Sequence, residues 1–304
     1  EFADLFGNRK PAEITKQELD QFISGKRLNK RNPTKEIAQT TRHNLHRAVC
    51  AFFTYCWKEK WVLENPMDYV NSPDPARLSP KILTIDQAKK LLDFVEEKHT
   101  DMLGFFALSL FCGIRVQELC RMTIQDLALD SHDAKYYAII RPEVAKIGRP
   151  RNVNIPYNCF TWLNSWLTNA RIPISRNHHT KRKLEDTDRI VPVSAASVFY
   201  RTKLIAKESG IVLPQNVLRH SFASYFFETT HDAEQTRARL GHETDDILFK
   251  HYAQLVGRAR HPIEYFKIIP NSVNWDGIES DLGVRKKPEI LRANTTDTFR
   301  LLNL

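Results

Sequence analysis

The sequence predicts a mainly α-helical protein of two domains, with a small β-sheet at one side of the second domain. Three observations support this fold class. Along most of the chain, apolar residues recur at the three- and four-residue spacing of helices. Only "YYAII" (136–140) and "RNVNIP" (151–156) have the composition of strands. A segment with three prolines, "NSPDPARLSPK" (71–81), separates two helical regions.

The composition describes a globular protein. The chain has 304 residues, of which 42% are hydrophobic, and this length is ample for two buried cores. No apolar run approaches the roughly 18 residues of a membrane span, and "EFADLFGNRK" at the start lacks the apolar stretch of a signal peptide. Five cysteines without a CxxC pair indicate reduced, buried thiols. We therefore expect an intracellular, cytoplasmic protein without membrane association.

The first domain is predicted over residues 1–71, followed by a linker over 72–82. A capping box of Thr15 and Glu18 begins one helix. A second helix is expected within residues 34–60, and the helical unit ends at Pro66. The apolar face expected for this second helix consists of Ile37, Thr41, Leu45, Ala48, Phe52 and Cys56.

A net charge of +9 is compatible with a polyanionic partner. Residues 26–60 hold nine Lys or Arg residues against two Glu residues. Such a stripe is either an ordinary solvated face or a DNA-binding surface, and its position on a helix favours DNA. The candidate DNA-binding residues here are Lys35, Arg42, His43 and Arg47.

The second domain is predicted over residues 83–270, with a tail over 271–304. A capping box of Thr84 and Gln87 begins its first helix, and the apolar helix "MLGFFALSLFCG" ends near Gly113. The helical pattern resumes in "IRVQELCRM", and the two strands flank "VAKIGRP" as a hairpin. The remaining helices are expected near 157–170, 195–209, 217–229, 232–240 and 244–255.

Four short motifs in this domain each have an ordinary structural explanation. Arg115 and Glu118, three residues apart, could form a surface ion pair. Lys146, Arg149 and Arg151 could simply make a basic turn, in which the three are interchangeable contacts of a phosphate backbone. At a helix start, Arg219 could bind neighbouring carbonyl groups. Tyr252 could pack its ring and expose its hydroxyl.

The order of these motifs resembles the tyrosine recombinases, the phage-integrase-type site-specific recombinases. The resemblance rests on "GIRVQEL" (113–119), Lys146, "NVLRH" (216–220), "LGH" (240–242) and Tyr252. Upstream, "AVCAFFTYCWKEKWVLENP" is similar to the end of the family's core-binding domain. The resemblance implies an N-terminal helical core-binding domain followed by an α+β catalytic domain.

The same resemblance implies metal-independent and ATP-independent cleavage and rejoining of DNA strands. Tyr252 would attack phosphorus and form a 3′-phosphotyrosine intermediate. Arg115 and Arg219 would stabilise the charge on the phosphate oxygens, since guanidinium groups bind phosphate through two parallel N–H donors. The implied DNA-binding residues of the hairpin are Arg149 and Arg151.

Supporting roles follow from the family pattern. His242 or Glu118 would act as base or positioning group, and Lys146 would protonate the leaving 5′-oxygen. Asn216 stands where the family usually has a histidine. An asparagine can donate a hydrogen bond but cannot become cationic, which leaves its contribution to cleavage open.

The implied partner is a double-stranded DNA recombination site. Bound to paired sites, the protein would be a homotetramer, and without DNA a monomer or dimer. Residues 271–304 would either be exchanged between protomers or form a disordered tail. No cofactor is implied, and no metal, because His242 and His251 lack partners at metal-ligand spacing. Two alternatives are a type IB topoisomerase and a catalytically inactive DNA-binding module.

Overall fold

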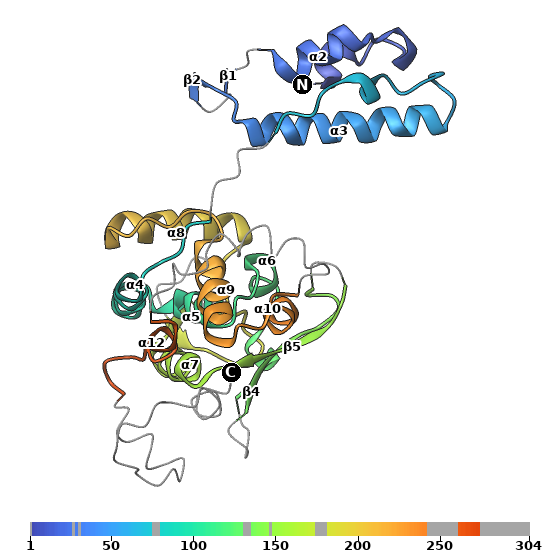
Figure 1. The fold of residues 1–304 in the computed structure, drawn as a ribbon. Helices are drawn as coiled ribbons and strands as arrows, with labels where there is room; N and C mark the ends of the chain where they lie inside the picture. The colour runs from blue at the N-terminus through green and yellow to red at the C-terminus, as the bar shows by residue number, and fades with distance from the viewer. Residues whose placement is uncertain are drawn as a thin grey trace. The chain divides into compact units, whose positions relative to one another are not determined.

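A computed structural model describes residues 2–25, 28–29, 32–74, 80–129, 135–145, 148–173, 181–241 and 261–273. The chain forms two compact units, Glu1–Leu78 and Ser79–Leu304 (Figure 1). Each unit has its own apolar core. Among the described residues, none of the helices has the length and apolar character needed to cross a membrane.

The first unit consists of helices with one short hairpin. Its elements are α1 (Phe2–Phe6), η1 (Pro11–Glu13), α2 (Lys16–Ser24), β1 (Leu28–Asn29), β2 (Asn32–Glu36), α3 (Gln39–Lys58) and η2 (Pro66–Tyr69). The predicted capping box is present, with Thr15 accepting a hydrogen bond from the Glu18 backbone and Glu18 reaching back to Thr15. Phe22, Ile23 and Phe53 are buried between α2 and α3.

The buried face of α3 differs from the predicted one. Its buried residues are Arg42, His46, Val49, Phe53 and Cys56, whereas Thr41, Ala48 and Phe52 are exposed. Two polar side chains can occupy this face because their polar atoms bind backbone carbonyls. The Nε2 atom of His46, for example, lies 3.0 Å from the carbonyl oxygen of Val70. Residues 32–36, partly assigned to the helix by the sequence, form β2 instead.

The second unit is built around the apolar helix α5, which packs against α4, α7 and α9. Its helices are α4 (Ile85–Lys98), η3 (Thr100–Met102), α5 (Leu103–Phe111), α6 (Val116–Leu119), η4 (Ile124–Asp126), α7 (Tyr157–Asn169), α8 (Ala195–Ser209), α9 (Val217–Thr230), α10 (Ala233–Leu240) and α12 (Pro262–Tyr265). Every described residue of α5 is buried, which explains why its sequence has no polar face. The capping box of Thr84 and Gln87 is present as predicted.

A small antiparallel sheet lies at one side of this unit, in the order β3-β4-β5 (Figure 1). Its strands are β3 (Leu127–Ala128), β4 (Tyr136–Ile140) and β5 (Arg151–Ile155), and Ile140 pairs with Arg151. The predicted hairpin is therefore confirmed. A second antiparallel pair, β6 (Arg171–Pro173) and β7 (Lys181–Lys183), was not predicted, because its residues are largely basic and carry no apolar alternation.

The mainly helical fold class with a small sheet is confirmed. The predicted helix near 244–255 and nearly all of the predicted tail, residues 274–304, lie outside the described residues.

Candidate functional site

The turn between α5 and α6 places Arg115. Gly113 has a left-handed backbone (φ +61°), and a Cβ atom there would collide with the ring of Phe222. Only glycine meets both requirements without strain. Arg115 is the N-cap residue of α6, so its side chain leaves the helix at its first turn.

The guanidinium groups of Arg115 and Arg219 bind two consecutive carbonyl groups at the end of α10. Nη2 of Arg115 donates to the carbonyl oxygen of Gly241 at 2.7 Å, and Nη2 of Arg219 donates to that of Leu240 at 2.6 Å. Arg219 also donates to the carbonyl oxygen of Gly113. Residues more than 100 positions apart are thus brought together immediately before His242.

Glu118 is the buried anion of this cluster. Its side chain is 1% exposed, and its Oε1 accepts from Nη1 of Arg115 at 3.1 Å. Arg151 binds the same carboxylate with two nitrogens, at 3.1 and 2.6 Å. Burial by itself would raise the pKa of Glu118, but the hydrogen bonds and charge of Arg151, helped by Arg115, outweigh it and lower the pKa.

This arrangement counts against Arg151 as a DNA contact. Its side chain is 15% exposed and both terminal nitrogens face Glu118. The neighbouring Arg149 is exposed, and its predicted contact with DNA stays a prediction. The two arginines are therefore not interchangeable. This differs from the basic-turn interpretation, which treated them as equivalent phosphate contacts.

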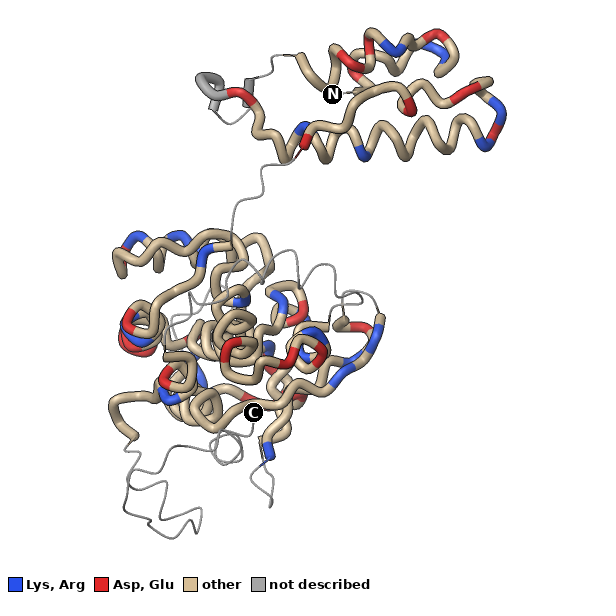
Figure 2. Tube along the Cα trace, viewed as in Figure 1, with Lys and Arg blue, Asp and Glu red and all other residues tan. Residues whose placement is uncertain are grey.

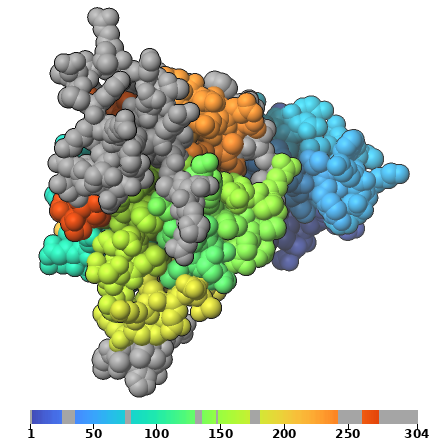
Figure 3. All heavy atoms as spheres, turned by 90° about the horizontal axis from the view of Figure 1, so that it is seen from below, coloured from blue at the N-terminus to red at the C-terminus, as the bar shows by residue number. Residues whose placement is uncertain are grey.

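The end of α10 is fixed beside the hairpin (Figure 1). Nη1 of Arg239 donates to the carbonyl oxygen of Asn154 at 3.1 Å, and its guanidinium lies 4.9 Å from the ring centre of Phe226. Burial lowers the pKa of Arg239. In the space-filling view of Figure 3 the orange atoms of α9 and α10 adjoin the green atoms of the hairpin. Nothing in the sequence indicated these contacts of Arg239, since its partners are distant along the chain.

Asn216 caps α9 with a left-handed backbone (φ +63°) and an exposed side chain. Its side chain makes no capping hydrogen bond to the helix. Asparagine and histidine adopt this conformation more readily than most residues. The position therefore suits either the asparagine found here or the histidine usual in the resembling family.

In the first unit, the four candidate DNA-binding residues differ in exposure. Arg42 is 6% exposed, and its Nη1 donates to the carbonyl oxygens of Ile23 and Gly25, at 3.0 and 2.7 Å. It thus satisfies carbonyl groups at the end of α2, which argues against a contact with DNA. His43 is half-buried, with Nδ1 3.1 Å from the carbonyl oxygen of Pro73.

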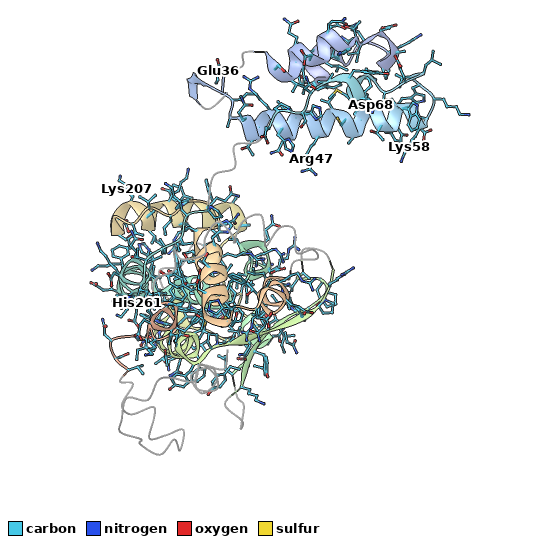
Figure 4. The ribbon with its side chains drawn as sticks, viewed as in Figure 1. Glu36, Arg47, Lys58, Asp68, Lys207 and His261 are labelled. Atoms are coloured by element: carbon cyan, nitrogen blue, oxygen red, sulfur yellow. The ribbon has the colours of Figure 1, made fainter. Side chains whose placement is uncertain are left out.

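Arg47 is exposed, and its side chain projects from α3 on the side away from α2 (Figure 4). The helix around it contains no Asp or Glu (Figure 2). The side chain of Lys35 lies outside the described part of the structure. Arg47 is therefore the candidate in this unit that the described geometry supports best.

Lys146, His242 and Tyr252 also lie outside the described residues. The described residues that flank them in sequence are Ala145 and Gly148, on either side of the segment with Lys146, and Gly241, directly before His242. In the parts of the chain that are described, no three His, Cys, Asp or Glu side chains form a group that could hold a metal ion.

Residues 81–257 match the sequence profile of the phage integrase family. The chain belongs to this family. Its members, the tyrosine recombinases, are site-specific recombinases that cleave and rejoin DNA. A curated relative, tyrosine recombinase XerC of Xylella fastidiosa (strain M23), is 26% identical over 229 residues, which cover 71% of this chain and 72% of the relative.

Solved structures of family members share the fold. A lambda integrase(75–356) dimer bound to a COC′ core site matches with a TM-score of 0.58 at 15% identity, covering 83% of each chain. The XerH site-specific recombinase bound to a palindromic difH substrate, in a post-cleavage complex, matches with a TM-score of 0.59 at 17% identity. That match covers 94% of this chain and 77% of XerH.

Proposed function

We propose that this tyrosine recombinase cleaves and rejoins double-stranded DNA at a specific site through a 3′-phosphotyrosine intermediate formed by Tyr252. The observation that carries the proposal is the pairing of Arg115 and Arg219 on the carbonyls of Gly241 and Leu240. It concentrates two permanent positive charges beside the segment that leads to His242 and Tyr252 in sequence.

The two arginines supply the charge stabilisation that phosphodiester cleavage requires. A guanidinium has five N–H donors, and the contact with Gly241 and the contact with Glu118 use two of those on Arg115. In the transition state the non-bridging oxygens of the phosphate gain negative charge, which fixed donors stabilise most strongly in a site that excludes water. Both side chains remain charged at every physiological pH.

Proton transfers complete the reaction. The hydroxyl of Tyr252 loses its proton as its oxygen bonds to phosphorus, and the bond to the 5′-oxygen breaks while Lys146 protonates that oxygen. Glu118 is a poor base for the first transfer, because its pKa is lowered and both its oxygens bind arginines. His242 is then the base, and Asn216 donates a hydrogen bond to the phosphate. Attack by the freed 5′-hydroxyl reverses the step without ATP.

The first unit supplies DNA affinity in this scheme. Residues 1–71 act as the core-binding domain, 72–82 as linker and 83–270 as catalytic domain. Arg47 and Arg149 contact backbone phosphates. Two DNA sites are held by a homotetramer, to which residues 271–304 contribute contacts between protomers.

A plasmid assay tests the proposed reaction. The purified protein is incubated with a supercoiled plasmid that carries two copies of the DNA flanking its gene, since integrases often lie beside their own attachment site. We expect products recombined between the two copies. Relaxation without recombination would instead indicate a topoisomerase, and an unchanged plasmid with bound protein a DNA-binding module.

A further inference from the structure

Arg151 lies on the basic hairpin but binds a buried carboxylate instead of facing solvent. Both of its terminal nitrogens bind Glu118, whose carboxylate in turn accepts from the side chain of Arg115 at 3.1 Å and from its backbone nitrogen at 3.3 Å. The carboxylate of Glu118 thus links Arg151 to Arg115. It pairs with Ile140 at the base of the hairpin that carries Lys146.

We propose that Arg151 is a positioning residue for DNA cleavage, which holds Glu118 as a fixed anion so that Glu118 orients Arg115 toward the phosphate. The inference rests on the proposed function, because it concerns the same site.

Charge balance supports this assignment. With one arginine and one carboxylate alone, Glu118 would cancel the charge of Arg115 that the phosphate needs. The second guanidinium restores a net positive charge to the trio. The contacts divide accordingly, since Arg151 binds both oxygens while the side chain of Arg115 binds one.

Steric packing fixes the geometry further. Gly241 has no side chain, and a Cβ atom there would lie 2.9 Å from Cζ of Arg151. The guanidinium of Arg151 is thus held between Glu118 and the backbone of Gly241. The same Gly241 carbonyl accepts from Arg115, so the hairpin, α6 and the end of α10 meet at one ion cluster.

The surroundings of Glu118 make its ionisation depend on Arg151. Two charged groups act on its carboxylate, Arg115 at the start of α6 and Arg151 on β5, while Arg219 from α9 and Arg239 from α10 bind backbone carbonyls instead. Arg151 contributes the two hydrogen bonds from one guanidinium, and Arg115 contributes one from its side chain and one from its backbone nitrogen. In Arg151→Met, burial would dominate and raise the pKa of Glu118, whereas the wild-type carboxyl stays ionised.

The test measures covalent adduct formation in a single turnover, with excess protein on a plasmid carrying the gene-flanking DNA, from mildly acidic to mildly alkaline pH. We expect Arg151→Met to slow the reaction by about 10- to 100-fold, as misplaced catalytic groups do. The ratio of its rate to that of wild type should fall further as pH falls, because a protonated Glu118 no longer pairs with Arg115. The dissociation constant for DNA should be unchanged.

Three further variants complete the test. Arg151→Met combined with Glu118→Gln removes the titrating group, so its rate ratio should not vary with pH. Arg151→Lys keeps the positive charge beside Glu118. Its rate should be lower than that of wild type, and the ratio of the two rates should be the same at every pH. Arg201→Met breaks a comparable two-nitrogen pair with Asp101, at 2.8 Å for both contacts, and should leave the rate ratio near one.

A pH-independent loss in Arg151→Met would overturn the inference, as would wild-type rates. If Arg151→Met does not fold, Arg151→Lys decides, because a wild-type rate from that variant rules out a positioning role. An inactive wild-type protein would instead overturn the proposed function, and the inference with it.

Discussion

Gly241→Ala tests the packing at the centre of the site. Gly241 has φ +62°, and the new Cβ atom would lie 2.9 Å from Cζ and 3.0 Å from Nε of Arg151. A guanidinium at the end of a flexible side chain could normally move aside. Here its two hydrogen bonds to Glu118 oppose the movement.

The expected cost has two parts. An alanine in the left-handed conformation destabilises the fold by roughly 1–2 kcal/mol. Moving Arg151 weakens a charged hydrogen bond, which adds up to about 1.5–3 kcal/mol if that bond is lost. The displaced cluster should also slow cleavage by about 10- to 100-fold.

Gly210→Ala is the matched control. Gly210 ends α8 with φ +70°, and no atom lies within 4 Å of the Cβ position. It therefore carries the backbone cost alone, about 1–2 kcal/mol, with an unchanged cleavage rate. The measurements are urea unfolding and single-turnover adduct formation for both variants. Equal losses of stability and equal rates in the two variants would refute the packing argument.

Three further predictions concern single side chains. Asn216→Gly keeps the left-handed backbone and removes the donor, so cleavage should slow by roughly one to two powers of ten, about 1.4–2.7 kcal/mol, while Asn216→His should be tolerated; a wild-type rate from the glycine variant would show that the donor is dispensable. Arg47→Ala should lower the slope of log affinity against log salt by about one unit, whereas Arg42→Ala should leave the slope unchanged and lower the melting temperature of the first unit; the opposite pattern would return Arg42 to the DNA surface. Lys146→Ala should be very slow on ordinary DNA and close to wild type on a substrate with sulphur at the bridging 5′ position, because a thiolate with a pKa near 8.5 leaves without a proton. Arg115→Ala should remain slow on both substrates. If the sulphur substrate does not rescue Lys146→Ala, then Lys146 is not the general acid.

Local signals in the sequence predicted much of the fold. The capping boxes at Thr15 and Thr84 depend on residues three positions apart, and both are present. The hairpin strands were recognisable from their composition, together with the Gly148 turn between them. The buried face of α3 was predicted wrongly, because Arg42 and His46 are buried through bonds to carbonyls on other segments. Helical periodicity treats such residues as exposed.

The candidate site was predictable only in part. The motif order indicated Arg115, Arg219 and Glu118, and the structure brings these three together. The role of Arg151 could not be predicted, since a basic residue in a hairpin has the same local pattern whether it contacts DNA or a buried carboxylate 33 positions away. A pair of residues this far apart in the chain produces no periodic pattern in the sequence from which the contact could be predicted.

The most direct test of the central claim is to identify the residue that becomes bonded to DNA. A nicked substrate containing the recombination site traps the covalent complex, because the 5′ fragment diffuses away, and mass spectrometry of the digested adduct locates the phosphate. We predict a 3′-phosphate on the peptide containing Tyr252, and no adduct from Tyr252→Phe at an unchanged dissociation constant for DNA. An adduct that persists in Tyr252→Phe, or a phosphate located on another residue, would contradict the account.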